Sequence, residues 1–501
     1  MNVNEHTKAI QVLTLNTMAF TVCFACWVLN GVLVTFLVEN DVFKWTQIQV
    51  GWLIGIPILS GSIARLPVGV LTDKYGGRGV YALLMLISAV PMYFLSMAES
   101  YSGFLLASLG FGLAGSAFAV GIAYTSVWFP ANRQGTALGI FGAGNAGAAL
   151  TSMGAPALLT YLTSGGANLE GWRNLPRFYA VALVLMALVF LVFTYPRKKE
   201  VAGVTGIRAR LAPLSNVRVW RFGLYYFLVF GGFVALSQWL IPYYVSAYGM
   251  SVTAAGLTAS IFSLPSGVIR ALGGWLSDRF GARSIMYAVL VSCLVCSVLL
   301  IVPRMDLQLP GRGLMAVRSG VVTTVEADRI VVDGQEYKLR PKAPEPGQVR
   351  AGIQVLPTRS YWHSPEVRVG DRVQKRQLLA SGTTHIQFQA NVWIFTALVF
   401  TVGIMMGIGK AAVYRYIPDY FPAAVGVVGG IVGVVGGLGG FVCPIIFGYL
   451  LEKTGIWTTC WIFLAALSAI SLVWMHLVIQ RMMHEHAPRM MAHMETGHGS
   501  H

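Results

Sequence analysis

The sequence predicts an all-α membrane protein with twelve transmembrane helices, arranged as two pseudo-symmetric six-helix bundles. The first observation behind this prediction is composition: 55% of the 501 residues are hydrophobic, only 11% are charged, and the mean hydropathy is +0.65. A water-soluble chain of this length carries considerably more charge. The other two observations are internal repeats, because each relates a segment of the first half to a segment of the second.

The first repeat places an arginine inside an apolar helix in each half of the chain. Residues 65–78 read RLPVGVLTDKYGGR, and residues 270–283 read RALGGWLSDRFGAR. Charge within the hydrocarbon region is costly, so an arginine there is a functional hypothesis by default. Arg65 and Arg270 are therefore expected to face each other near mid-membrane and hold an anion. In the alternative, one or both arginines snorkel to the interface or pair with an acid.

Twelve apolar runs are long enough to cross the bilayer, since a helix rises about 1.5 Å per residue and the hydrocarbon is roughly 30 Å thick. They begin near residues 12, 46, 79, 103, 134, 176, 220, 252, 284, 391, 424 and 456. They predict one bundle at 1–195 and a second at 220–303 and 391–480. All six cysteines lie in such runs, which implies no disulfide framework.

The connector at 196–219 carries six arginines and lysines against one acid, Glu200. By the positive-inside rule this connector is cytoplasmic, and both termini are then cytoplasmic as well. The net charge of +16 is accounted for largely by such short loops, so it predicts orientation in a membrane and no binding of nucleic acid. The expected location is the inner membrane of a bacterium.

The second repeat relates residues 118–130, FAVGIAYTSVWFP, to residues 410–422, KAAVYRYIPDYFP. Its spacing exceeds that of the first repeat by 87 residues, which predicts an insert at 304–390, between the ninth and tenth helices, on the outer side. Alternating apolar residues with Gly and Asp turns predict short β-strands there. The segments resemble the barrel-sandwich hybrid module. The insert's basic residues either form an ordinary solvated face or concentrate anions near the outer entrance of the bundle.

A glycine run follows each copy of the second repeat, GTALGIFGAGNAG at 135–147 and GVVGGIVGVVGGLGG at 426–440. Small residues at every fourth position let membrane helices approach closely. The runs predict either a static packing seam or helices that move against each other during alternating access. The expected gating and helix-packing residues are Asp73, Arg78, Asp278, Arg283, Gly139, Gly142, Gly144, Gly430, Gly433 and Gly437.

The glycine run with its single asparagine, after the WFP loop, resembles a signature of the nitrate/nitrite porters of the major facilitator superfamily, the NarK-type transporters. The DKYGGR and DRFGAR loops resemble the general gating motif of that superfamily. The resemblance covers both bundles, omits the insert, and implies the major facilitator fold and nitrate and nitrite as substrates. It implies a substrate site formed by Arg65, Arg270, Phe118, Asn145, Tyr226 and Phe230.

The expected function is nitrate import by alternating access, because a planar guanidinium presents two parallel donors to a flat oxyanion. Moving one anion inward against the membrane potential costs about 2.3 kcal/mol per 100 mV, so either protons accompany nitrate or nitrite leaves in exchange. Lys410 corresponds to Phe118 in the second repeat and is the candidate for proton coupling. The segment GIGKAAVYRYIPDYFP resembles the proton-coupled branch of the family. In the alternative, this lysine is permanently paired or snorkels.

The expected partners are nitrate, nitrite, protons and the lipid bilayer, with no cofactor, no metal and no enzymatic activity; the partner of the insert is unknown. A function of another class stays open, in which a transporter-derived sensor uses the outer β module and the helices only signal. The tail at 481–501 is rich in His and Met. Such a tract either binds soft or borderline metals or is incidental.

Overall fold

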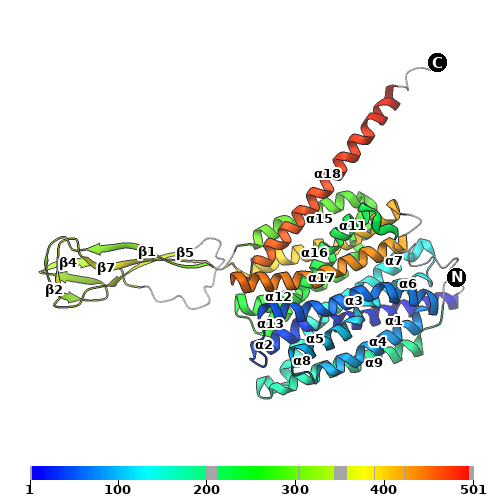
Figure 1. Cartoon of the computed structure of the whole chain (residues 1–501), viewed down its shortest axis with the longest axis horizontal. Coiled ribbons are helices and arrows are strands. Elements are labelled where there is room, and N and C mark those ends of the chain that lie inside the picture. Colours follow the sequence, from blue (N-terminus) through cyan, green and yellow to red (C-terminus); the bar gives the residue numbers. More distant parts are fainter. Residues whose placement is uncertain are drawn as a thin grey trace. The chain divides into compact units, whose positions relative to one another are not determined.

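The computed structural model describes residues 3–197, 212–302, 305–342, 358–388, 390–421 and 425–495. These divide into two compact units. The larger unit comprises Met1–Ile301 and Thr396–His501 and is helical, and the smaller comprises Val302–Phe395 and contains the β-strands (Figure 1). The insert expected at 304–390 falls within the smaller unit.

Among the described residues, the first half of the helical unit contains nine helices and several short 3-10 segments. In chain order its helices and the two 3-10 segments used below are α1 (Val3–Trp27), α2 (Asn30–Glu39), α3 (Gln47–Tyr75), α4 (Gly77–Leu95), α5 (Tyr101–Phe111), η1 (Gly112–Ser116), α6 (Ala117–Ser126), α7 (Ala131–Gly142), η2 (Ala143–Ala146), α8 (Gly147–Leu162) and α9 (Asn174–Phe193).

The second half repeats this arrangement with longer continuous helices and one π-helical turn. Its elements are α11 (Val217–Tyr226), η6 (Phe227–Gly231, the π turn), α12 (Gly232–Tyr248), α13 (Val252–Val268), α14 (Arg270–Phe280), α15 (Ala282–Leu300), α16 (Val392–Tyr420), α17 (Val425–Thr454) and α18 (Thr459–Glu495).

Ten helical segments among the described residues are long and apolar enough to cross a membrane. The number rises to eleven when α13 and α14, which meet at a bend of 48°, are taken as one broken span. The chain is therefore mostly helical and multi-pass. Twelve spans remain a prediction, because α7, η2 and α8, where a span is expected near residue 134, do not enter that number.

Glycines bring the two halves into backbone contact at one end of the bundle. A Cβ atom added at Gly51 of α3 would lie 2.5 Å from the carbonyl oxygen of Pro444 in α17, and one at Gly448 of α17 would lie 2.3 Å from that of Gln47. A Cβ at Gly256 of α13 would lie 2.1 Å from the oxygen of Ser152 in α8. No side chain fits into such contacts, so small residues determine how closely the halves approach.

The same helices pack more loosely toward the opposite end. A Cβ at Gly139 of α7 would come no closer than 3.7 Å to Ala271 of α14, and one at Gly430 of α17 would lie 3.9 Å from Leu66 of α3. Added Cβ atoms at Gly69 and Gly274 meet no described atom within 4 Å. The seam is therefore tight where α3 begins and α17 ends, and open where α3 and α14 end.

Each arginine-bearing segment ends in a turn that requires glycine. Gly76, between α3 and α4, has φ of 88°, and Gly281, between α14 and α15, has φ of 83°. L-residues with side chains rarely adopt this region, which explains why glycine occupies the same place in both repeats. Beside these turns, Arg78 donates to the carbonyl of Leu191, and Arg415 Nε lies 2.7 Å from Asp278 Oδ1.

The smaller unit has two antiparallel sheets, of strand order β1-β7-β5 and β4-β3-β2-β6. Its core consists largely of aliphatic side chains, among them Val322, Ile330, Val332 and Leu379. The resemblance to a barrel-sandwich module remains a prediction. The strands are β1 (Met305–Met315), β2 (Gly320–Val325), β3 (Arg329–Val332), β4 (Gln335–Lys338), β5 (Thr358–Pro365), β6 (Arg372–Val373) and β7 (Leu378–Phe388).

We expect Gly76→Ala to destabilise the helical unit by about 1–3 kcal/mol, the usual cost of a strained backbone conformation. Gly79→Ala is the matched control, because Gly79 lies within α4 with no described atom near its added Cβ. Thermal unfolding of both variants in detergent measures the difference. Equal midpoints for the two alanine variants would contradict the assigned backbone strain.

Candidate functional site

The two repeated arginines lie against the same aromatic ring. Arg65, on α3, and Arg270, the first residue of α14, have their guanidinium carbons 5.4 and 5.3 Å from the ring centroid of Phe118 on α6. The bend between α13 and α14 places Arg270 at a helix start inside the bundle. The structure therefore brings together two cations from opposite halves and the aromatic residue named for this site.

Further aromatic rings enclose Arg65, which is only 5% exposed. Its guanidinium carbon lies 5.5 Å from the ring of Trp27 and 5.1 Å from that of Phe230. Phe230 stacks on Tyr226 at a centroid distance of 5.0 Å and an interplanar angle of 6°. The π turn η6 begins directly after Tyr226 and contains Phe230, and such turns are frequent at functional sites. Desolvated cation–π contacts of this kind are worth about 2 kcal/mol each.

The side chain of Arg65 also makes a hydrogen bond to the main chain of the opposite half. Its Nη1 donates to the carbonyl oxygen of Gly433 in α17 over 2.7 Å. Cβ atoms at Gly433 and Gly437 would lie 3.7 and 3.6 Å from this nitrogen, and would come still closer to Tyr414 Oη, at 3.0 Å, and Ser62 Oγ, at 2.1 Å, respectively. On the other side of the site, a Cβ at Gly142 would lie 3.3 Å from Arg270 Cδ.

The glycines of each signature run therefore border the arginine of the opposite half. Gly142 belongs to the first half and adjoins Arg270, while Gly433 and Gly437 belong to the second half and adjoin Arg65. The other named glycines lie elsewhere along the same helices. A Cβ at Gly144 would meet Phe20 at 2.4 Å within the first half.

Several buried polar atoms at this site make no hydrogen bond within the described structure. They are Arg65 Nε, Arg270 Nη1, and both side-chain atoms of Asn145, a residue with no exposed surface. The backbone of Asn145 packs against Gly267, three residues before Arg270, since a Cβ there would lie 3.1 Å from the carbonyl carbon of Asn145. Buried polar groups are nearly always satisfied, so these atoms indicate where a polar ligand would bind.

Tyr414 belongs to the site although the sequence analysis did not identify it. Its ring lies 5.5 Å from the guanidinium carbon of Arg270 and meets Tyr226 edge-on at 5.0 Å. Its hydroxyl donates to the carbonyl oxygen of Gly429 over 3.0 Å. The available signal was its position four residues after Lys410, because residues i and i+4 share a helix face.

Lys410 is fully buried on α16. Its Nζ lies 3.4 Å from the ring centroid of Phe233 and donates to Ser266 Oγ over 3.3 Å. Ser266 precedes Arg270 by four residues, which places the lysine one helical turn away from the arginine along α13 and α14. Within the described ranges, no carboxylate lies within ion-pair distance of Arg65, Arg270 or Lys410.

A family model described as Major Facilitator Superfamily matches residues 15–323 and 377–491. A relative from Thermus thermophilus named "Probable nitrate/nitrite antiporter NarK1" is 39% identical over 96% of this chain and 94% of its own length. A Bacillus subtilis (strain 168) protein named "Nitrite extrusion protein" is 24% identical over 93% of this chain and 94% of its own length. "Probable nitrate transporter NarT" of Staphylococcus aureus (strain JH9) is 28% identical over 95% of this chain and 97% of its own length.

Among solved structures, an inward-facing, occupied bacterial homologue of the human lysosomal transporter Spinster matches with a TM-score of 0.61. It covers 94% of this chain and 96% of its own at 14% identity. The nucleoside transporter NupG matches with a TM-score of 0.59, covering 96% and 99% at 13% identity. At these identities the likeness concerns the fold alone.

Proposed function

The chain belongs to the Major Facilitator Superfamily, and from that premise we propose that it imports nitrate by alternating access, coupled to protons. It is a membrane transporter and not an enzyme. The observation that carries the substrate proposal is that buried Arg65 and partly buried Arg270, from opposite halves, both lie against the ring of Phe118. The names of the relatives, which refer to nitrate and nitrite, support it.

The chemistry of the site suits a small, flat monoanion. Each guanidinium fork offers parallel N–H donors that match two in-plane oxygens of nitrate or nitrite. Arg65 Nε and Arg270 Nη1 are buried donors without partners in the described structure, and Asn145 adds an amide. The rings of Phe118, Tyr226 and Phe230 confine the ion and exclude water, which strengthens each charge-assisted hydrogen bond.

Arg65 links the binding of the substrate to the movement of the two halves. Arg65 Nη1 donates to the Gly433 carbonyl of the opposite half. A bound nitrate shared by Arg65 and Arg270 neutralises part of the excess positive charge and joins the halves through the substrate. The halves then rock about it, with the tight glycine seam opening as the loose one closes.

Proton coupling rests on Lys410 in this proposal. The buried amine has only a serine hydroxyl and an aromatic face as contacts, so its charge is not fixed by a carboxylate within the described part of the chain. A proton carried on Lys410 would offset the charge of the imported anion and the cost of about 2.3 kcal/mol per 100 mV. In this arrangement the protein lies in a bacterial inner membrane with both termini cytoplasmic.

Nitrate/nitrite exchange is the second candidate, and one observation favours it. The relative that is 39% identical is named an antiporter. Exchange also avoids net charge movement, since one monoanion leaves for each that enters. Counterflow in sealed vesicles, with nitrate outside and nitrite inside, separates the two: exchange requires internal nitrite, while symport requires a pH gradient.

Arg65→Lys and Arg270→Lys should each weaken nitrate binding by between about tenfold and a hundredfold. Lysine keeps the charge but loses the bidentate fork, and a hydrogen bond to a charged group is worth about 1.5–3 kcal/mol. Nitrate uptake into proteoliposomes measures the loss. Arg279→Lys, on the exposed end of α14, is the matched control and should retain uptake. Undiminished uptake by the Arg65 or Arg270 variant would refute the site.

Lys410→Gln should abolish the pH dependence of nitrate uptake, because the side chain that accepts the proton is gone while its hydrogen-bonding ability remains. Initial rates across a pH series, in vesicles without internal nitrite, provide the measurement. Lys453→Gln, at the exposed end of α17, should keep the wild-type profile. If the Lys410 variant also keeps that profile, coupling does not use this lysine and exchange is favoured.

Replacing residues 304–390 by a short Gly/Ser linker distinguishes the transporter from a sensor that uses the β unit. A transporter should retain nitrate flux, because the arginine site lies wholly in the helical unit. Size-exclusion chromatography and thermal unfolding of the purified variant establish that the bundle is folded. Complete loss of flux in a folded variant would favour the sensor.

A further inference from the structure

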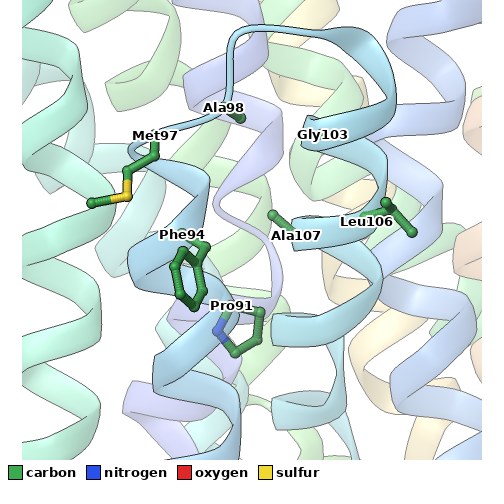
Figure 2. A pocket seen from close by; sticks show the side chains of 7 residues that line it. All are labelled: Pro91, Phe94, Met97, Ala98, Gly103, Leu106 and Ala107. Atoms are coloured by element: carbon green, nitrogen blue, oxygen red, sulfur yellow. The ribbon is translucent and has the colours of Figure 1, made fainter.

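An open hollow of about 430 Å³ lies between α4 and α5, separate from the arginine site. Pro91 and Phe94 on α4 and Leu106 and Ala107 on α5 line it, and Figure 2 shows Ala107 on the side of α5 toward Phe94 and Pro91, with Leu106 farther round α5. Its size falls in the range of small-molecule sites, roughly 300–1,000 Å³. All the residues that line it are apolar or glycine.

The packing of the two helices explains the hollow. A Cβ at Gly110 of α5 would lie 2.5 Å from Pro91 Cβ, so the helices touch there and diverge toward their connection. Both helices belong to segments apolar enough to cross a membrane. Side chains beside the hollow remain exposed, including Phe94 at 57% and Leu106 at 70%. The hollow therefore faces the hydrocarbon of the bilayer.

Two arginines of the segment around the start of α9 adjoin the connection between α4 and α5, at the wider end of this hollow. Arg173 Nη1 donates to the carbonyl oxygens of Ser96 and Ala98, at 3.0 and 3.4 Å, and Arg177 Nε donates to Ser96 Oγ over 3.1 Å. Arg173 forms an ion pair with Glu170, with 2.5 Å between Nε and Oε2. Arg177 also donates to Asn174 Oδ1, but has no carboxylate within ion-pair distance in the part of the chain that is described.

The connection between α4 and α5 also carries a negative charge. Glu99 follows Ala98 directly and is exposed. Arg177 and Glu99 thus provide one cation and one anion near the end of an apolar hollow. This combination complements a zwitterionic headgroup that carries a phosphate and a primary ammonium.

We propose that the hollow between α4 and α5 binds one phosphatidylethanolamine molecule, with an acyl chain between Phe94 and Leu106, the phosphate at Arg177 and the ammonium at Glu99. The site is independent of the anion carried at Arg65 and Arg270. A phosphatidylcholine headgroup would keep the phosphate contact, but its quaternary ammonium donates no N–H hydrogen bond to Glu99.

Native mass spectrometry of the purified full-length protein, titrated with phosphatidylethanolamine, phosphatidylcholine or phosphatidylglycerol of identical acyl chains, tests the proposal. We expect phosphatidylethanolamine to bind about tenfold more tightly than phosphatidylcholine, the usual effect of one charge-assisted hydrogen bond. Equal affinity for these two lipids, or a preference for phosphatidylglycerol, would overturn it.

Two charge variants test the headgroup contacts. Arg177→Gln should weaken binding of phosphatidylethanolamine about tenfold, while Arg218→Gln, at an exposed position of α11, should not change it. Glu99→Gln should remove the preference over phosphatidylcholine. Wild-type affinity in the Arg177 variant, or a retained preference in the Glu99 variant, would contradict the assignment.

A matched pair of glycine variants tests the hollow itself. A Cβ at Gly103 points toward Ala98 and Ser100 at 3.6 and 3.3 Å, so Gly103→Leu should fill the hollow and lower occupancy by all three lipids. Gly154→Leu places the same side chain in open space on α8 and should leave occupancy unchanged. Undiminished occupancy in a folded Gly103 variant would show that the acyl chain lies elsewhere.

Discussion

The structure of the bundle depends on accommodating buried guanidinium groups for which no carboxylate lies nearby in the described residues. An unpaired charge in a low-dielectric interior costs several kcal/mol. Here part of that cost is offset by aromatic faces, which attract a desolvated cation more strongly than an exposed one. Trp27, Phe118 and Phe230 all lie within 5.5 Å of the guanidinium carbon of Arg65. The proposed preference for anions rests on the donors that remain unsatisfied, Arg65 Nε and Arg270 Nη1.

The glycine runs have two physical roles that the sequence alone could not separate. Toward the end where α3 begins, glycines such as Gly51 permit backbone contact between the halves. At mid-bundle, Gly142 and Gly433 leave space beside an arginine from the opposite half, and Gly437 permits close contact with Ser62 beside Arg65. The arginine site thus depends on small residues contributed by the partner half, and the seam and the site are parts of one arrangement.

Repeats predicted the site better than local patterns did. Arg65 and Arg270 stand at equivalent places in two copies, and such pairs are expected to meet at a pseudo-symmetry axis. Tyr414 has no such counterpart, because the second repeat aligns it with Ile122, and its one signal was its position four residues after Lys410. The π turn after Tyr226 and the divergence of α4 and α5 depend on tertiary packing, for which an apolar run has no signal. The family follows from the comparison with known proteins, while the number of spans and the role of each site residue remain predictions.

The partner of Arg65 Nη1 is a main-chain oxygen, and this has a consequence for how the site tolerates genetic variation. Every amino acid supplies the same carbonyl group, so no substitution at position 433 removes the acceptor while α17 stays helical. The volume of a new side chain there displaces the Tyr414 hydroxyl, 3.0 Å from an added Cβ, before it reaches the guanidinium at 3.7 Å. This contact therefore limits the volume of the side chain at position 433. A change in the polarity of that side chain leaves the main-chain acceptor in place.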